Sequence, residues 1–157
     1  MKKYKEPNGL NDVALFHETF DLPILSKISI PDKKRCELRI SLLQEELNEL
    51  KQAIDDNDIV EVVDALCDLQ YVLSGAILEF GVGDKFKDCF DEVQRSNMSK
   101  TCKSLDEAEA TLEHYIKKDG TIGHIVRRGE EFLVYRISDQ KVLKSINYSP
   151  AELKQFL

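Results

Sequence analysis

The chain has 157 residues, 42% of them hydrophobic, which is enough for one domain with an apolar core. Its 22 Lys and Arg against 29 Asp and Glu give a net charge of −7, so we expect no nucleic acid as main partner. The polar start, the lack of a long apolar run and four dispersed cysteines predict a cytoplasmic protein without a membrane partner and with reduced thiols.

The first predicted helix covers VALFHETF, residues 13–20. Asn11 or Asp12 can cap it, and Leu22-Pro23 ends it. Phe16 and Phe20 lie on one side at helical spacing. His17 sits beside them, where a histidine more often packs or stacks than catalyses.

Two longer helices follow. Pro31-Asp32 suits a helix start, and the third helix, residues 58–80, ends at Gly81. Gly75 inside it predicts a close helix approach. Arg39 is expected to neutralise a carboxylate or a phosphate, or to form a surface salt bridge. The predicted buried face of the second helix consists of Leu38, Ile40, Leu43, Leu47, Leu50 and Ile54, and that of the third consists of Val62, Leu66, Leu69, Leu73 and Ala76.

The same two helices carry two acidic stripes. A short acidic turn at residues 55–58 brings the stripes face to face, so we expect the carboxylates to converge. A solvated face usually alternates in sign, but no Lys or Arg occurs between Lys51 and Lys85. Clustered carboxylates at the margin of a core favour a site for Mg²⁺ or Mn²⁺. The stripes are Glu45, Glu46 and Glu49 on the second helix, and Glu61, Asp64 and Asp68 on the third.

A fourth helix is predicted from Asp84 to Asn97. Four helices with short connections favour an antiparallel four-helix bundle. The end of this helix, Arg95-Ser96-Asn97-Met98-Ser99-Lys100, concentrates cations, hydroxyls and an amide. That segment can hold phosphates and a base over the acidic site, or it is an ordinary polar helix end.

After Lys100 the pattern changes. Ser104 to Glu107 forms a capping box for a helix up to about residue 118, followed by strand-like runs at 121–127, 132–137 and 141–146. We expect a hairpin or three-stranded sheet, then a capped helix near Ser149. The predicted domains are a helical core, residues 1–100, and a small α+β appendage, residues 101–157, that packs on the core or on a partner subunit.

The acidic pattern resembles a known signature. Glu45-Glu46-x-x-Glu49 followed by Glu61-x-x-Asp64 is similar to the E-E-x-x-E … E-x-x-D motif of the all-α nucleoside triphosphate pyrophosphohydrolases. These include MazG, the dimeric dUTPases and dCTPases, and phosphoribosyl-ATP pyrophosphohydrolase. Residues 63–71 and 95–100 look most like a branch related to the last of these, as do Phe16-His17-x-x-Phe20 and Lys141 to Tyr148.

The resemblance implies an all-α fold and Mg²⁺-dependent cleavage between the α- and β-phosphates of a nucleotide, giving a monophosphate and pyrophosphate. It implies Glu46, Glu49, Glu61 and Asp64 as metal ligands. Asp68 also occupies the place of the family's final aspartate, so we expect Asp64 and Asp68 to act together. Glu45 or Glu49 would be the catalytic base that orients water. Arg95, Lys100 and Lys144 would hold phosphates, and Asn97 with Phe16 or Phe20 would contact the base.

Two further expectations follow. The apolar helix faces are too extensive for a monomer of this size, which, with the family likeness, favours a homodimer or a dimer of dimers. The alternative to an enzyme is a non-catalytic acidic helical module that binds a basic protein partner. Such a module would show no metal dependence.

Overall fold

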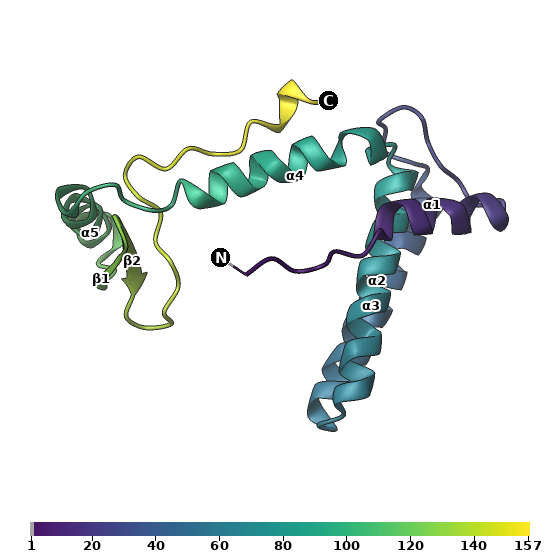
Figure 1. Ribbon diagram of the computed structural model, residues 1–157, viewed down its shortest axis with the longest axis horizontal. Coiled ribbons are helices and arrows are strands. Elements are labelled where there is room, and N and C mark those ends of the chain that lie inside the picture. Colours follow the sequence, from purple (N-terminus) through teal and green to yellow (C-terminus); the bar gives the residue numbers. More distant parts are fainter. Residues whose placement is uncertain (1) are drawn as a thin grey trace. The chain divides into compact units, whose positions relative to one another are not determined.

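A computed structural model describes residues 2–157 (Figure 1). The fold class is confirmed: the chain is mainly α-helical, with a small antiparallel hairpin near its C-terminus. The elements are α1 (Gly9–Thr19), α2 (Lys33–Asp55), α3 (Ile59–Glu79), α4 (Gly83–Met98), α5 (Leu105–Asp119), β1 (Gly123–Arg128), β2 (Glu131–Arg136) and a 3₁₀ turn, η1 (Leu153–Gln155).

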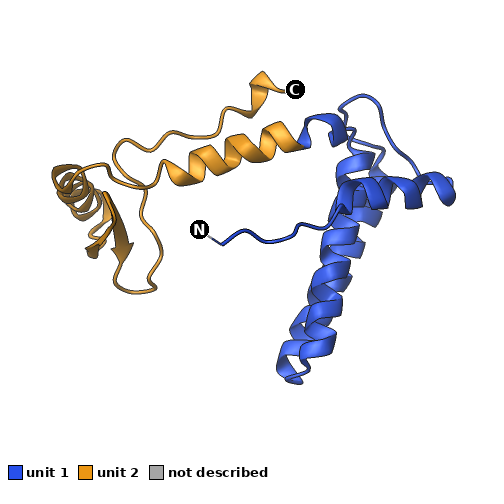
Figure 2. Cartoon of the chain, in the orientation of Figure 1, with its two compact units in different colours: residues 1–86 blue, residues 87–157 orange. Residues whose placement is uncertain are grey.

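Contacts divide the chain into two compact units (Figure 2). The first ends at Phe86, and the second runs from Lys87 to Leu157, so the division falls inside α4. The sequence analysis placed a domain boundary at Lys100, just after α4. That boundary stays a prediction.

In the first unit, α2 and α3 form an antiparallel helical hairpin, and α1 crosses it near one end (Figure 1). Both long helices begin where expected. The Asp32 carboxylate accepts a hydrogen bond from the Arg35 amide at 3.1 Å, and Asp58 accepts from the amides of Val60 and Glu61 at 2.9 and 3.2 Å. These side chains satisfy amides that have no partner in the first helical turn.

The seam between α2 and α3 differs from the predicted one. The buried residues of α2 are Arg39 and Ala53, and Glu46, halfway between them at i+7, is half-buried. Since i and i+7 share a helix face, this charged and small-residue stripe faces α3. The prediction of an apolar seam was therefore wrong for six of the residues assigned to it. On α2 these are Leu38, Ile40, Leu47 and Ile54, and on α3 they are Leu66 and Leu73, all of which are exposed.

A buried ionic cluster holds one end of this unit together. The Glu79 carboxylate accepts hydrogen bonds from the guanidinium groups of Arg35 and Arg39. Arg39 thus neutralises a carboxylate, which was one of the predicted alternatives. The alternative of a surface salt bridge was wrong, because the Arg39 side chain is only 8% exposed and pairs with the buried Glu79. His17 joins α1 to the cluster: Nδ1 lies 2.9 Å from the Pro23 carbonyl oxygen and Nε2 lies 3.2 Å from Arg39 Nη2.

Gly75 permits this arrangement, as its place in α3 predicted. A Cβ atom at this position would lie 2.6 Å from Arg39 Nη1 and 3.1 Å from His17 Nε2. Buried side chains of two other helices therefore fill the space that a side chain at residue 75 would need.

The second unit has a conventional apolar core. Cys102, Ala108, Val134 and Leu143 are buried together between α5 and the hairpin. Ser104 caps α5 by accepting from the Glu107 amide at 3.1 Å, and the Glu107 carboxylate accepts from the Lys103 amide at 2.8 Å. The capping box is confirmed, with the return bond made one residue earlier than in the standard form.

The end of the chain is less regular than predicted. The expected third strand is reduced to a single bridge between Tyr135 and Val142. The helix expected near Ser149 is instead the short turn η1. Polar contacts to α4 hold this segment: Arg95 donates to Ser149 Oγ at 3.1 Å and to the Pro150 carbonyl at 2.9 Å. These side-chain bonds replace the regular backbone ladder that a strand or helix would need.

Within residues 2–157, no single helix is long and apolar enough to cross a membrane. The broken pair α3 and α4, taken together, meets the length and composition criteria. The four cysteines are all free.

Candidate functional site

The acidic part of the α2–α3 hairpin is centred on Glu46. This residue faces α3 and is half-buried, and its Oε2 atom is buried without a hydrogen-bond partner among the described residues. A buried carboxylate oxygen without a donor is costly, since desolvation is not repaid by a bond. A cation would supply the missing interaction.

The surroundings of Glu46 increase this cost. Burial raises the pKa of Glu46, and the negative charges of Glu49, Asp68, Glu45 and Asp64 raise it further, in that order. Four of the predicted site residues therefore act electrostatically on the fifth. These four come from both helices, so the hairpin does bring the two stripes toward one another, as expected.

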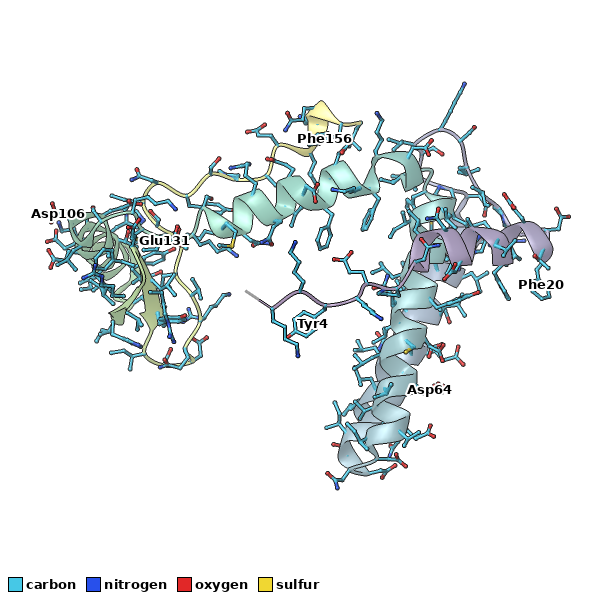
Figure 3. The ribbon with its side chains drawn as sticks, in the orientation of Figure 1. Tyr4, Phe20, Asp64, Asp106, Glu131 and Phe156 are labelled. Carbon is cyan, nitrogen blue, oxygen red and sulfur yellow. The ribbon has the colours of Figure 1, made fainter. Side chains whose placement is uncertain are left out.

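The carboxylates do not form a closed ligand cage. Among residues 2–157, no three His, Cys, Asp or Glu side chains are gathered closely enough to hold a metal ion. Figure 3 shows the Asp64 side chain projecting away from α3.

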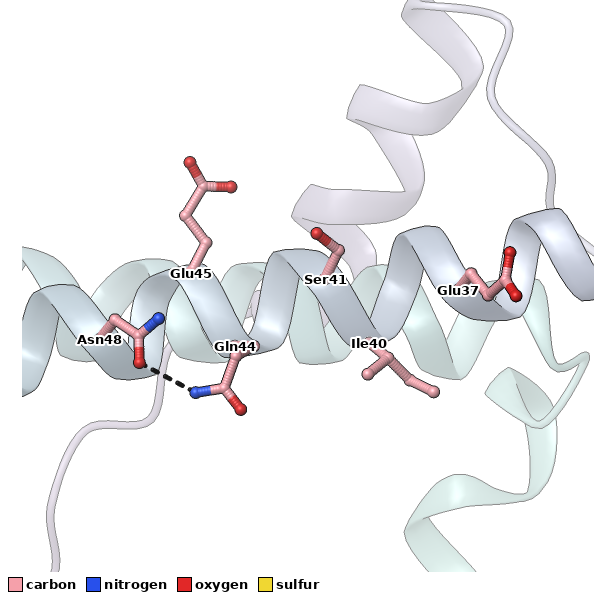
Figure 4. Close-up of a pocket in the computed structure, with 6 residues that line it drawn as sticks. All are labelled: Glu37, Ile40, Ser41, Gln44, Glu45 and Asn48. Atoms are coloured by element: carbon pink, nitrogen blue, oxygen red, sulfur yellow. Dashed lines mark hydrogen bonds between the residues drawn. The ribbon is translucent and has the colours of Figure 1, made fainter.

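The remaining acidic residues lie at the edges of the site. Glu61 shares a surface groove with Asp64 and Cys67 on α3, and it does not contribute to the raised pKa of Glu46. Glu45 lines a groove on the outer side of α2 together with Ser41 (Figure 4). Glu45 and Glu61 are both exposed.

The predicted aromatic residues form a cluster on α1 and α3. The ring centroids of Phe16 and Phe20 lie 4.4 Å apart, and Phe16 meets Tyr71 edge-on at 5.6 Å. Tyr71 is 39% exposed and follows Asp68 by one helical turn. Tyr71 therefore connects the aromatic cluster to the acidic stripe of α3.

The predicted phosphate-binding residues lie in the second unit. Lys100 Nζ donates to Asn97 Oδ1 at 2.7 Å, and Lys144 Nζ lies 4.2 Å from the centre of the Tyr148 ring. The hydrogen bond with Ser96 lowers the pKa of Tyr148, and the charges of Lys144 and Lys100 lower it further. No carboxylate within residues 2–157 forms a salt bridge with either lysine, so neither ammonium group has an acidic partner there.

Arg95 is differently placed. It forms a bidentate pair with Glu92 at 2.7 and 2.8 Å, in addition to its bonds to the C-terminal segment. This pair holds the pKa of Glu92 down at about 2. In this arrangement the Arg95 guanidinium connects α4 to the segment around residue 150.

The helical region that carries the acidic site matches a known protein family. The family model described as phosphoribosyl-ATP pyrophosphohydrolase matches residues 13–97, more than half of the chain. The chain belongs to this family. The matched region contains α1 from Val13 onward, α2, α3 and nearly all of α4, and with them all six acidic residues. Residues 98–157, with Lys100, Lys144 and the hairpin, lie outside it.

A viral protein is similar to the chain over a longer region. The uncharacterized protein L479 of Acanthamoeba polyphaga mimivirus is 23% identical to this member of the phosphoribosyl-ATP pyrophosphohydrolase family. The alignment covers 85% of this chain and 89% of the relative, so it also includes part of the C-terminal unit.

The residues of this family member fit a hard divalent cation. Their donors are all carboxylate oxygens, which Mg²⁺ and Mn²⁺ prefer, and one of these oxygens is buried and unpaired. Glu46, Glu49, Asp64 and Asp68 would hold such an ion, with Glu61 at the rim.

Proposed function

We propose that this chain is a Mg²⁺-dependent nucleoside triphosphate pyrophosphohydrolase. Water would attack the α-phosphorus, the bond from that phosphorus to the α–β bridging oxygen would break, and a nucleoside monophosphate and pyrophosphate would leave. The observation that carries the proposal is the buried, unpaired Glu46 Oε2, set among Glu49, Asp68, Glu45 and Asp64 in a family of pyrophosphohydrolases.

The chain's own carboxylates have two roles, metal binding and proton transfer. When bound, Mg²⁺ (or Mn²⁺) supplies positive charge against the phosphates and lowers the pKa of a coordinated water. Glu46, Glu49, Asp64 and Asp68, with Glu61, hold it. Glu49 or the exposed Glu45 accepts the proton of the attacking water, which requires a carboxylate that is ionised near neutral pH.

Cationic groups bind the phosphates of the nucleotide. Lys100 and Lys144 are paired with neutral groups only, which leaves both side chains available to bind a phosphate. Arg95 contributes by fixing the segment after Lys144 to α4, and it reaches a phosphate only by giving up those bonds.

A homodimer, or a dimer of dimers, belongs to the proposal. Several large apolar side chains on the outer faces of α2 and α3 are more than half exposed. Apolar surface of this extent on two long helices favours burial against another subunit. The residues are Ile40, Leu47, Ile54, Ile59 and Val60.

The test is pyrophosphate release from a panel of NTPs and dNTPs, with and without Mg²⁺. We expect metal-dependent release, reduced by at least about 100-fold in Glu49→Gln and Asp68→Asn variants that keep their helical circular dichroism. Asp55→Asn, at the exposed C-terminal end of α2, is the matched control and should retain activity.

A different result would support the alternative function. If no nucleotide releases pyrophosphate and calorimetry detects no Mg²⁺ or Mn²⁺ binding, the enzyme proposal fails. The acidic hairpin would then be a non-catalytic surface for a basic protein partner, and its binding should weaken as salt rises.

A further inference from the structure

A cavity of about 440 Å³ lies between the start of α1 and the outer side of α3. Small-molecule sites usually measure about 300–1,000 Å³ and combine apolar walls with a few polar groups. Val63, Leu66 and Cys67 form the α3 wall, and the cavity is mostly apolar. Its size and lining fit a flat ring system.

The wall from α1 exists because Gly9 comes close to α3. A Cβ atom at residue 9 would lie 3.5 Å from Ser74 Oγ and 3.7 Å from the Gln70 side chain. This contact places Asp12, one turn further along α1, at the cavity. The opening is therefore bounded by two helices of the same compact unit.

Two polar side chains line the cavity, Asp12 and Gln70. One Asp12 oxygen receives only a long hydrogen bond from Asn8, at 3.3 Å, and no partner within residues 2–157 reaches the other. Gln70 donates one N–H to Ser74 Oγ at 3.3 Å and keeps its second N–H and its carbonyl oxygen for a ligand. An ionised carboxylate accepts hydrogen bonds but cannot donate them.

The position of the cavity ties it to the acidic stripe. On α3, Val63 and Cys67 directly precede Asp64 and Asp68, so the cavity lies about a quarter turn around the helix from these carboxylates. Tyr71 lines the cavity and follows Asp64 by seven residues and Asp68 by three, which places it between the two surfaces. A nucleotide with its phosphates at the carboxylates can thus reach the cavity with its base.

The chemistry of Asp12 selects among the bases. Adenine and cytosine present an amino group beside a ring nitrogen lone pair, and uracil and thymine present one N–H between two carbonyls, so each places a lone pair near the carboxylate. Guanine alone presents two adjacent N–H donors, N1–H and the 2-amino group. A carboxylate accepts such a pair through both oxygens.

We propose that this cavity is the base site and that it prefers guanine, with Asp12 accepting from N1–H and the 2-amino group. The second N–H of Gln70 donates to an acceptor on the same base, and the ring rests on Leu66 and Tyr71. The inference rests on the proposed function only for the phosphates, since a nucleoside can occupy the cavity without metal.

The experiment measures binding of guanosine, inosine, adenosine, cytidine and uridine to the full chain by NMR titration, without divalent metal. Guanosine should bind most tightly, and inosine, which lacks the 2-amino group, should bind about tenfold more weakly. Asp12→Asn should remove the preference for guanosine over inosine. Leu66→Trp, at a position that is 52% exposed and so tolerant of size, should fill the cavity and abolish binding.

Glu18→Gln, on the same helix but outside the cavity, is the matched control and should keep the guanosine preference. Equal affinity for all five nucleosides, no binding, or a preference that survives Asp12→Asn would overturn the inference. Metal-dependent pyrophosphate release without guanine preference would leave the proposed function standing and reject the base site. Guanosine binding without pyrophosphate release from GTP or dGTP would support the base site and reject the proposed function.

Discussion

The two compact units differ in their net charge and in the residues that they bury. The first has ten Lys and Arg against seventeen Asp and Glu, whereas the second has twelve of each, so the whole net charge of −7 belongs to the first. The first buries Arg39 and Glu79 between its helices, and the second buries Cys102, Val134 and Leu143. A unit that keeps charges inside depends on pairing them, while a unit with an apolar core depends on filling space.

The largest effect is expected from breaking the buried ion cluster. Glu79→Gln would leave two guanidinium groups without their carboxylate, and removing one partner of a buried pair costs about 3–5 kcal/mol. Urea unfolding followed by circular dichroism measures it. Glu113→Gln, which removes an exposed pair with Lys117, is the control and should cost less than about 0.5 kcal/mol. Equal losses in both variants would refute the comparison.

Low pH should cause part of the same loss of unfolding free energy. Burial raises the pKa of Glu79, but its bonds to Arg39 and Arg35 outweigh burial and hold that pKa below the ordinary value of 4.5. Its contribution is therefore complete above pH 4.5 and is lost as the pH falls through the lower, folded-state pKa. Unfolding free energies of wild type and Glu79→Gln should converge as the pH falls below 4.5. Parallel curves would contradict this assignment.

A smaller loss is expected in the second unit. Val134 is completely buried, and Val134→Ala removes two methyl groups from its apolar core, which should cost about 2 kcal/mol of unfolding free energy. Val126→Ala, on the opposite face of the hairpin and half-buried, is the control and should cost less. A larger loss at Val126 would mean that the outer face is the better packed one.

The smallest loss of stability is expected at the start of α5 in the second unit. Ser104→Ala removes the N-cap of α5 and should cost about 1 kcal/mol. The control is Ser138→Ala, in the exposed turn after β2. If thermal melting shows the same midpoint for both variants, the cap does not stabilise this unit.

Local signals predicted the helices well. Asp32, Asp58 and Ser104 begin helices because each side chain accepts from an amide two or three residues ahead, which sequence spacing reveals directly. Gly81 ends α3 with a φ of 69°, which glycine adopts without strain. The segment at 141–146 was harder, because a strand needs a partner along its length and only Val142 finds one.

The sequence by itself determined the five helices and the hairpin, the two acidic stripes and the family signature, since each depends on residues close together in the chain. Only the tertiary structure decided which helix faces meet. Periodicity identified apolar arcs around Ile40 and Leu66, but α2 and α3 join instead through Arg39, Glu46 and Ala53. The pairing of Arg39 with Glu79, forty residues away, depends on how two helices align. No local pattern encodes that alignment, because it results from the packing of the whole unit.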